Sequence, residues 1–243
     1  GPPSLRGEPA GRVFEAMPQR TVPAYNSLIT MHGRMREQAA AEALVQRMKA
    51  EALEPDVITY TSLLAAHGAV QDLEAAMRVL QAMKDASMPM DDIVYGTALS
   101  ACAKAGDLAK ARELLAEMDA VGLEPRLIHL TCLVNACTRW KDEASAREAF
   151  EEIRRRGVAP DAIAYTGLIG ALSGSGDELF AKAMALMAEM QEVGVEPDVW
   201  TFNAVLRAAE GVEDWGKVQA LLDDMDARGL APNQQTELIL GIV

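Results

Sequence analysis

The sequence predicts an all-α protein, a right-handed α-solenoid built from helix–turn–helix repeats. Three observations predict this fold class: a recurring closing motif, a near-constant distance between its copies, and an apolar pattern of helical period after each copy. The copies are Glu54-Pro55-Asp56, Glu124-Pro125-Arg126, Ala159-Pro160-Asp161, Glu196-Pro197-Asp198 and Ala231-Pro232-Asn233, with Met88-Pro89-Met90-Asp91 in the same register. The segments that they close are 35, 35, 35, 35, 37 and 35 residues long. A period in this range is typical of repeat arrays, in which each repeat packs only against its neighbours.

The predicted organisation follows from this period. Residues 1–21 are the tail of a preceding partial repeat, and residues 234–243 are the first helix of a truncated further one. The six full repeats between them are 22–56, 57–91, 92–126, 127–161, 162–198 and 199–233. The two extra residues of the fifth repeat are expected in its inter-helix turn, around 174–179, where they lengthen the turn and leave the stacking intact.

The first helix of each repeat shows apolar residues three and four apart, which define one helix face. The fourth residue is aromatic in five of the six repeats, and the series is Tyr25, Tyr60, Tyr95, Leu130, Tyr165 and Phe202. The seventh and eighth residues are apolar throughout. We therefore expect a helix of about a dozen residues that buries this face.

The second helix begins after an acidic residue in register, which is a good helix N-cap. These residues are Glu37, Asp72, Asp107, Asp142, Asp177 and Asp214. A small residue and, seven positions later, a methionine share one buried face in most repeats, as Ala41 and Met48 do in the first. Gly122, Gly157, Gly194 and Gly229 stand where a helix ends in a left-handed residue, with Ala52 and Ser87 in the first two repeats.

Composition limits the function. The chain has 243 residues, half of them hydrophobic, and a net charge of −13. No apolar run is long enough for a membrane span. The three cysteines, Cys102, Cys132 and Cys137, are odd in number and lack CxxC spacing, so we expect reduced, small buried residues and no disulfide framework. No targeting peptide is recognisable.

The pattern resembles the pentatricopeptide repeat family and its 35-residue P-type repeats. The family's opening, Val-x-Thr-Tyr-Asn-x-Leu-Ile, is matched by residues 57–64 and by residues 199–203, and its closing Gly-x-x-Pro-Asp matches the motif above. The resemblance covers residues 22–233. Tetratricopeptide repeats are the nearest alternative, but they are 34 residues long and differ in their aromatic and small residues.

The resemblance implies a groove, lined by the first helices, that holds single-stranded RNA with one base per repeat. The family reads bases through the fifth and last residues of each repeat. Here these pairs are Asn26 with Asp56, Thr61 with Asp91, Gly96 with Arg126, Thr131 with Asp161, Thr166 with Asp198, and Asn203 with Asn233. By the family's preferences the predicted target is U-G-n-G-G-Y. The third pair should read nothing or contact a phosphate, because glycine has no side chain and arginine cannot accept a hydrogen bond.

The second residue of each repeat supplies the clamp between bases in this family. At this position stand Pro23, Ile58, Ile93, Ile128, Ile163 and Trp200. Two interpretations stay open: flat apolar contact with bases, including stacking by Trp200, or packing between adjacent repeats.

The net charge opposes nucleic-acid binding, which depends strongly on neutralising phosphates. The first-helix segments nevertheless carry a small positive excess. Arg34, Lys104 and Arg139 share the thirteenth position, where the family often keeps a phosphate-contacting lysine. Ala69, Gly174 and Gly211 take that position in the other repeats. This gives a thin positive stripe along the groove.

We expect no catalytic centre, metal site, cofactor or small-molecule substrate. His32, His67 and His129 are too few and too separated for a metal cluster, and the first two are expected to be solvated or to lie at helix ends. The chain lacks a phosphate-binding glycine loop, a nucleophile elbow and zinc-ligand spacing. Family resemblance implies a chloroplast or mitochondrial protein that binds RNA in its stabilisation, processing or expression. The alternative is a protein-binding scaffold, an accessory subunit of a large organellar complex. The acidity of the chain favours this alternative.

Overall fold

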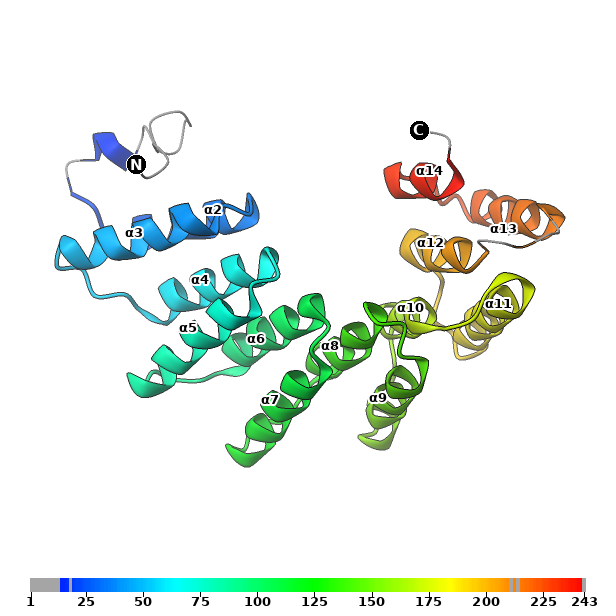
Figure 1. The fold of residues 1–243 in the computed structure, drawn as a ribbon, viewed down its shortest axis with the longest axis horizontal. Coiled ribbons are helices and arrows are strands. Elements are labelled where there is room, and N and C mark those ends of the chain that lie inside the picture. The colour runs from blue at the N-terminus through cyan, green and yellow to red at the C-terminus, as the bar shows by residue number, and fades with distance from the viewer. Residues whose placement is uncertain (1–13, 18, 210–211, 213–214, 242–243) are drawn as a thin grey trace. The chain divides into compact units, whose positions relative to one another are not determined.

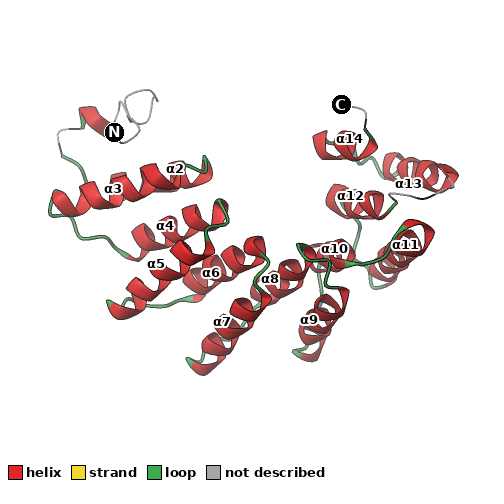
Figure 2. Cartoon of the chain, viewed as in Figure 1, coloured by secondary structure: helices red, strands yellow, loops and turns green. Residues whose placement is uncertain are grey.

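The computed structural model describes residues 14–17, 19–209, 212 and 215–241. Throughout this part of the chain the regular structure is helical, and no strand occurs in it, as Figure 2 shows. The chain divides into two compact units, Gly1–Pro125 and Arg126–Val243, which we call the N-terminal and C-terminal units. The all-α class predicted from the repeats is confirmed.

The N-terminal unit holds three helix pairs. Their bounds are α2 (Val22–Arg34) and α3 (Gln38–Ala50), α4 (Val57–Ala69) and α5 (Leu73–Asp85), and α6 (Asp92–Ala105) and α7 (Leu108–Ala120). Each helix packs on its partner, and the first helices α2, α4 and α6 pack on one another in sequence (Figure 1).

The C-terminal unit repeats this arrangement. Its helices are α8 (Leu127–Thr138) and α9 (Glu143–Arg155), α10 (Ala162–Ala171) and α11 (Gly176–Glu192), α12 (Val199–Ala208) and α13 (Trp215–Ala227), and a last first helix, α14 (Gln234–Leu240). The first helices α8, α10, α12 and α14 pack in sequence. A continuous layer of first helices therefore forms the wall of each unit.

The core follows the expected register. Tyr25, Tyr95, Tyr165 and Phe202 are fully buried at the fourth position, whereas Tyr60 is half-buried beneath Lys49. The small residue and the methionine of the second helix are also buried, as Ala41 and Met48 are. First helices approach closely where both surfaces are small: a Cβ on Gly68 would lie 2.9 Å from the Cβ of Ala101.

Most of the predicted helix ends are confirmed. Asp72, Asp107 and Asp142 each accept a hydrogen bond from a backbone N–H in the first turn of a second helix. The left-handed residues at the helix ends are Gly122, Gly157, Gly194 and Gly229, with Ala52 (φ 58°) and Ser87 (φ 51°) in the first two repeats. Asp214 lies outside the described residues.

Two predicted N-caps are wrong. The Glu37 side chain does not cap α3, because its carboxylate instead pairs with Nδ1 of His32 at 2.7 Å. Asp177 lies within the first turn of α11, whose N-cap position is Ser175. The inserted residues of the fifth repeat lengthen this helix to 17 residues, against 13 in the other second helices, so they extend the helix and not the turn.

The predicted environment of two histidines is partly wrong. His32 and His67 do lie near the ends of first helices, but both are buried, with 5% and 3% of their surface exposed. His67 pairs through Nε2 with Glu42 on the preceding second helix at 3.1 Å. These histidines are therefore part of the packing and not of the solvated surface.

Candidate nucleic-acid interface

The last residue of each repeat is also the N-cap of the next first helix. Asp56, Asp91, Asp161, Asp198 and Asn233 all have extended backbone and accept backbone N–H groups through Oδ1. A proline one or two residues earlier prevents the preceding helix from continuing into this cap. Because Oδ1 is held by the cap, the side-chain rotamer is fixed and the second terminal atom has a defined direction.

Asn26 and Asp56 meet in a hydrogen-bond network that crosses the boundary between the first two repeats. Asn26 Nδ2 donates to Asp56 Oδ1 at 3.0 Å, and Thr59 Oγ1 lies 2.6 Å from Asn26 Oδ1. Thr59 also donates its backbone N–H to Asp56 Oδ1 at 2.8 Å. Thr59 is fully buried and Asn26 is 7% exposed. The network thus holds the asparagine amide in one orientation, with one N–H hydrogen uncommitted.

The same network lowers the pKa of Asp56. Burial raises the pKa of this carboxyl, but hydrogen bonds from the Thr59 backbone and hydroxyl and from Asn26 outweigh burial and lower it overall. Asp56 is therefore ionised at neutral pH.

Asn203 reproduces this arrangement in the C-terminal unit. Its Nδ2 donates to Asn233 Oδ1 at 3.2 Å, and Thr236 Oγ1 donates to its Oδ1 at 2.8 Å. Thr236 also closes a capping box with Asn233. The two asparagine pairs are thus built alike, one ending in a carboxylate and the other in an amide.

The hydroxyls of the threonines at the fifth position form hydrogen bonds within the protein. Thr61 donates to Val57 O at 2.7 Å, and Thr131 donates to Ile128 O at 3.0 Å. Thr166 Oγ1 lies 2.9 Å from Thr201 Oγ1 of the next repeat. Since a hydroxyl has one hydrogen, Thr61 and Thr131 can only accept a further bond from a ligand.

The residues at the second position are exposed. Ile58, Ile93, Ile128, Ile163 and Trp200 have between 58% and 65% of their surface exposed. Of the two interpretations left open by the sequence, packing between adjacent repeats does not fit this exposure. The row lies at the start of the first helices, one turn from the fifth-position side chains.

The third repeat departs from the pattern as its sequence predicts. Gly96 brings no side chain, and Arg126 takes the N-cap position of α8 without a side-chain acceptor for the helix. His129 makes the return bond of a capping box, because its Nδ1 accepts the Arg126 N–H at 3.0 Å. The buried His129 is thus a capping residue.

The three cations at the thirteenth position, Arg34, Lys104 and Arg139, all lie exposed at the ends of first helices. The Arg139 guanidinium lies over the Trp140 ring, 5.7 Å from its centre. Of these three, Arg139 lines the cavity of the C-terminal unit described next.

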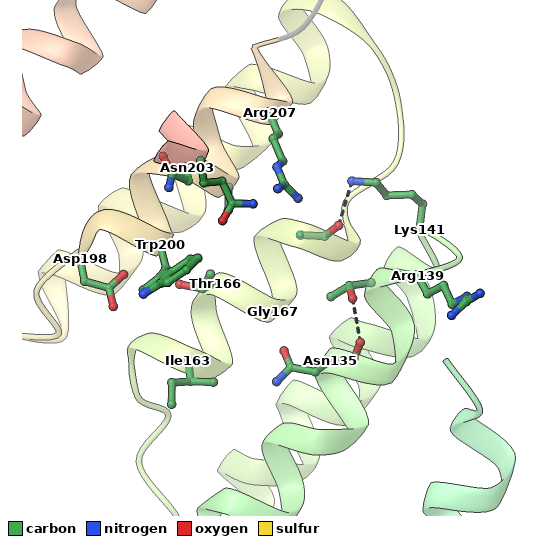
Figure 3. A pocket seen from close by; sticks show the side chains of 14 residues that line it. Asn135, Arg139, Lys141, Ile163, Thr166, Gly167, Asp198, Trp200, Asn203 and Arg207 are labelled. Atoms are coloured by element: carbon green, nitrogen blue, oxygen red, sulfur yellow. Dashed lines mark hydrogen bonds between the residues drawn. The ribbon is translucent and has the colours of Figure 1, made fainter. Parts of the chain in front are cut away.

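A cavity of about 580 Å³ opens over α8, α10 and α12 in the C-terminal unit. It brings together five residues that the sequence assigned to base reading or clamping: Ile163, Thr166, Asp198, Trp200 and Asn203. Figure 3 shows Trp200 and Ile163 at one end and the side chains of Thr166 and Asn203 between them and the basic end.

The basic end of the cavity contains two residues that sequence reasoning did not select, Lys141 and Arg207. Lys141 Nζ donates to Gly170 O at 2.9 Å. With Arg139 they give the lining three cations against one carboxylate, Asp198. Their repeat positions, fifteen and nine, carry no family signal, and only stacking of the helices reveals them.

Other chemistry is not evident in the described parts of the chain. No group of three or more His, Cys, Asp or Glu residues there is arranged to hold a metal ion. None of the helices described is both long enough and apolar enough to cross a membrane.

Comparison with solved structures identifies similar chains. The crystal structure of the pentatricopeptide repeat protein PPR10 from maize matches with 25% identity and a TM-score of 0.64, covering 90% of this chain and 31% of that one. PPR10 in complex with an 18-nt psaJ RNA element matches with 20% identity and a TM-score of 0.63, over 95% of this chain and 38% of that one. The chain therefore spans about a third of the PPR10 chain.

A third similar structure is the PPR domain of Arabidopsis thaliana protein-only RNase P 1 in complex with tRNA. It has 12% identity and a TM-score of 0.50, and the match covers 88% of this chain and 94% of that one. At this identity the likeness concerns the fold alone. A search of curated proteins gave no match.

Two family models match the sequence. The model described as the pentacotripeptide-repeat region of PRORP matches residues 89–241, and the PPR repeat family matches residues 20–69 and 55–104. The first alone covers more than half of the chain. The α-solenoid class predicted from the sequence agrees with these matches, and the chain belongs to the pentatricopeptide repeat family.

Proposed function

We propose that this chain binds single-stranded RNA along the first helices of its repeats, one base per repeat, in the order U-G-n-G-G-Y. The observation that carries the proposal is the cavity of the C-terminal unit, where base-reading and clamp residues predicted from the sequence line one basic hollow. RNA-bound PPR10, a chain of similar fold, supports the same assignment. By family resemblance the protein acts in a chloroplast or mitochondrion, in RNA stabilisation, processing or expression, and not as an enzyme.

Hydrogen-bond chemistry supports guanine at the threonine repeats. Thr131 donates its one hydroxyl hydrogen to a backbone carbonyl, and Asp161 caps α10 through Oδ1. Both side chains then offer only acceptors to a ligand. The Watson–Crick edge of guanine presents two donors, N1–H and N2–H, which such a pair complements.

The asparagine repeats suit a pyrimidine. Asn26 offers one remaining N–H hydrogen, because its oxygen and its other hydrogen are committed to Thr59 and Asp56. Uracil and cytosine both carry a carbonyl oxygen at O2 that can accept it. Asp56 Oδ2 can accept the N3–H of uracil.

The exposed second-position row supports the clamp role. Bases stack favourably on aromatic and apolar side chains, at roughly 1–3 kcal/mol per base for aromatic stacking. Trp200 is suited to this role because 58% of its surface is exposed at the mouth of the cavity.

The test measures binding to U-G-A-G-G-U RNA and to a scrambled RNA across salt concentrations. Phosphate contacts predict an affinity that falls steeply as salt rises. Thr131→Ala and Thr166→Ala should each reduce the preference for guanine over adenine at one position by about fivefold, the value of one hydrogen bond. Thr97→Ala is the matched control, because Thr97 makes the same bond to a backbone carbonyl, Ile93 O at 2.7 Å, but lies at the sixth position.

Retained discrimination in both variants would show that the fifth-position code does not apply here. Negligible binding of either RNA at low salt would instead favour a protein-binding scaffold, an accessory subunit of a large organellar complex. The net charge of −13 and the third repeat, which lacks a reading pair, favour that second function.

A further inference from the structure

The middle helix of the cavity in the C-terminal unit carries glycines where its neighbours carry longer side chains. The ninth residues of three successive repeats are Asn135 on α8, Gly170 on α10 and Arg207 on α12, and all three line the cavity. Gly167, one turn earlier on α10, lets α10 approach α8 closely, since a Cβ there would lie 2.4 Å from Asn135 Oδ1. Gly167 and Gly170 therefore mark where α10 lies close to α8, and the cavity opens beside this contact.

Two cations border this hollow from opposite sides. Figure 3 shows the Arg207 guanidinium extending from α12 toward α10, and Lys141 reaching the Gly170 turn of α10 from the other side. Lys141 Nζ donates to Gly170 O, but an ammonium has three N–H donors, so this bond leaves it able to contact an anion. Arg139 points away from Arg207 in Figure 3, and its guanidinium lies over the Trp140 ring.

We propose that Arg207 and Lys141 together bind one phosphate of the single-stranded RNA, beside the base read by Thr166 and Asp198. This inference rests on the proposed function and changes its phosphate contacts: in this repeat the contact comes from the ninth and fifteenth positions, and not from Arg139 at the thirteenth. A guanidinium and an ammonium on two sides of a small hollow suit a phosphate diester, which presents acceptors in several directions.

The surroundings favour an anion of this kind. The single carboxylate of the lining, Asp198, lies at the end of the cavity with Trp200 and away from Arg207 in Figure 3. The chain as a whole repels phosphates, so a local cluster of cations is where neutralisation would occur.

The experiment compares Arg207→Gln and Lys141→Gln with Arg139→Gln and Arg155→Gln, all in the full chain, by titration with U-G-A-G-G-U RNA across salt concentrations. Arg155 is the matched control, because it is an exposed cation at the end of the second helix α9. Each of the first two variants should weaken binding about fivefold at low salt and reduce the magnitude of the salt slope by about 0.7, the value for one phosphate contact to a single strand. The Arg139 and Arg155 variants should change affinity less than twofold. Circular dichroism checks that all four variants stay folded, since Arg207 is exposed.

A second set of RNAs places one uncharged methylphosphonate on either side of the fifth nucleotide. On one of these two RNAs the difference between the parent and Arg207→Gln should disappear, because the phosphate charge that Arg207 contacts is gone. If Arg207→Gln behaves as Arg155→Gln does while the parent binds RNA, the phosphate site is wrong and the proposed function stands. If the parent shows no salt-dependent RNA binding, both are wrong.

Discussion

The asparagine networks at the two ends of the sequence make the same hydrogen bonds with different charges. In the N-terminal unit Asn26 is held by Asp56 and Thr59, and in the C-terminal unit Asn203 is held by Asn233 and Thr236. Replacing the carboxylate by an amide leaves the network unchanged, because only Oδ1, common to both residues, takes part. The geometry is therefore set by the helix cap, and the charge of the last residue is free to determine which base is read.

The two helices that these networks cap differ in how many other helices pack against them. The α4 helix packs against α2, α3, α5 and α6, whereas α14, with seven residues, packs only against α12 among the described elements. The same hydrogen bonds should then contribute to global stability at one end and only to local order at the other.

Replacing the buried threonine of each network gives the largest expected effect. Thr59→Val keeps the shape of the side chain but leaves Asn26 Oδ1 as a buried acceptor without its donor, and it removes one half of the capping box. We expect a loss of about 2 kcal/mol in the free energy of unfolding, measured by urea titration. Thr236→Val should shift the urea midpoint little and instead speed the hydrogen exchange of amides in α14.

Equal losses of global stability in the two variants would contradict this comparison, since they would mean that α14 unfolds together with the rest. Thr97→Val, which replaces a half-buried threonine outside either network, controls for the loss of a hydroxyl from a first helix.

The networks show how far the sequence alone could lead. The period of 35 residues and the Pro-Asp motif predicted the helix pairs, most of their ends and the residues at each repeat boundary. They could not show that Asp56 serves at once as the cap of α4 and the partner of Asn26, because that depends on how closely consecutive first helices approach. The third residue of the next repeat, Thr59 or Thr236, completes each site, and its recurrence in the family's opening motif was the available signal.

Exchanging the last residue tests the role of charge in base preference. In Asn233 the Nδ2 group takes the place of the second carboxylate oxygen of Asp56, so it presents a donor where Asp56 presents an acceptor. A donor complements N3 of cytosine, and an acceptor complements N3–H of uracil. Asn233→Asp should therefore shift the preference at the sixth nucleotide from cytosine toward uracil by about fivefold, and Asp56→Asn should make the reverse shift at the first.

Competition between U-G-A-G-G-U and U-G-A-G-G-C measures the first shift, and C-G-A-G-G-U against U-G-A-G-G-U measures the second. A change in overall affinity with no change in preference would show that the last residue acts through charge alone.

The cavity is where the sequence was least informative. Its repeat position identified Arg139, which lines the cavity, but not Lys141 or Arg207, which line it from two different repeats. That these two cations share one cavity depends on how α8, α10 and α12 stack, and Gly167 and Gly170 on α10 carry no periodic signal. The sequence also could not predict that the inserted residues of the fifth repeat lengthen α11, because the length of a repeat does not determine which of its residues join the helix.

The smallest expected effect is the dependence of stability on pH, which only the carboxylate network should show. Burial raises the pKa of Asp56, but the bonds from Thr59 and Asn26 lower it overall, below the value of about 3.9 for an unfolded chain. A lowered pKa gives stability that is complete above the unfolded value and is lost as pH falls through the folded one. Because Asp56 is partly exposed, solvent screening keeps this contribution below about 1 kcal/mol.

The variant Asp56→Asn isolates the contribution of Asp56 ionisation to stability, since asparagine caps a helix as well as aspartate does but has no proton to gain. The difference in unfolding free energy between the parent and Asp56→Asn should stay constant well above the unfolded pKa of about 3.9 and move against the parent as the pH falls below it. Other carboxyls with lowered pKa values, such as Glu15 and Asp142, titrate in both proteins and cancel in the difference. A difference that stays constant from pH 7 to 2 would mean that the Asn26 network stabilises ionised Asp56 no more than protonated Asp56. The two ends of the chain would then be equivalent in charge as well as in geometry.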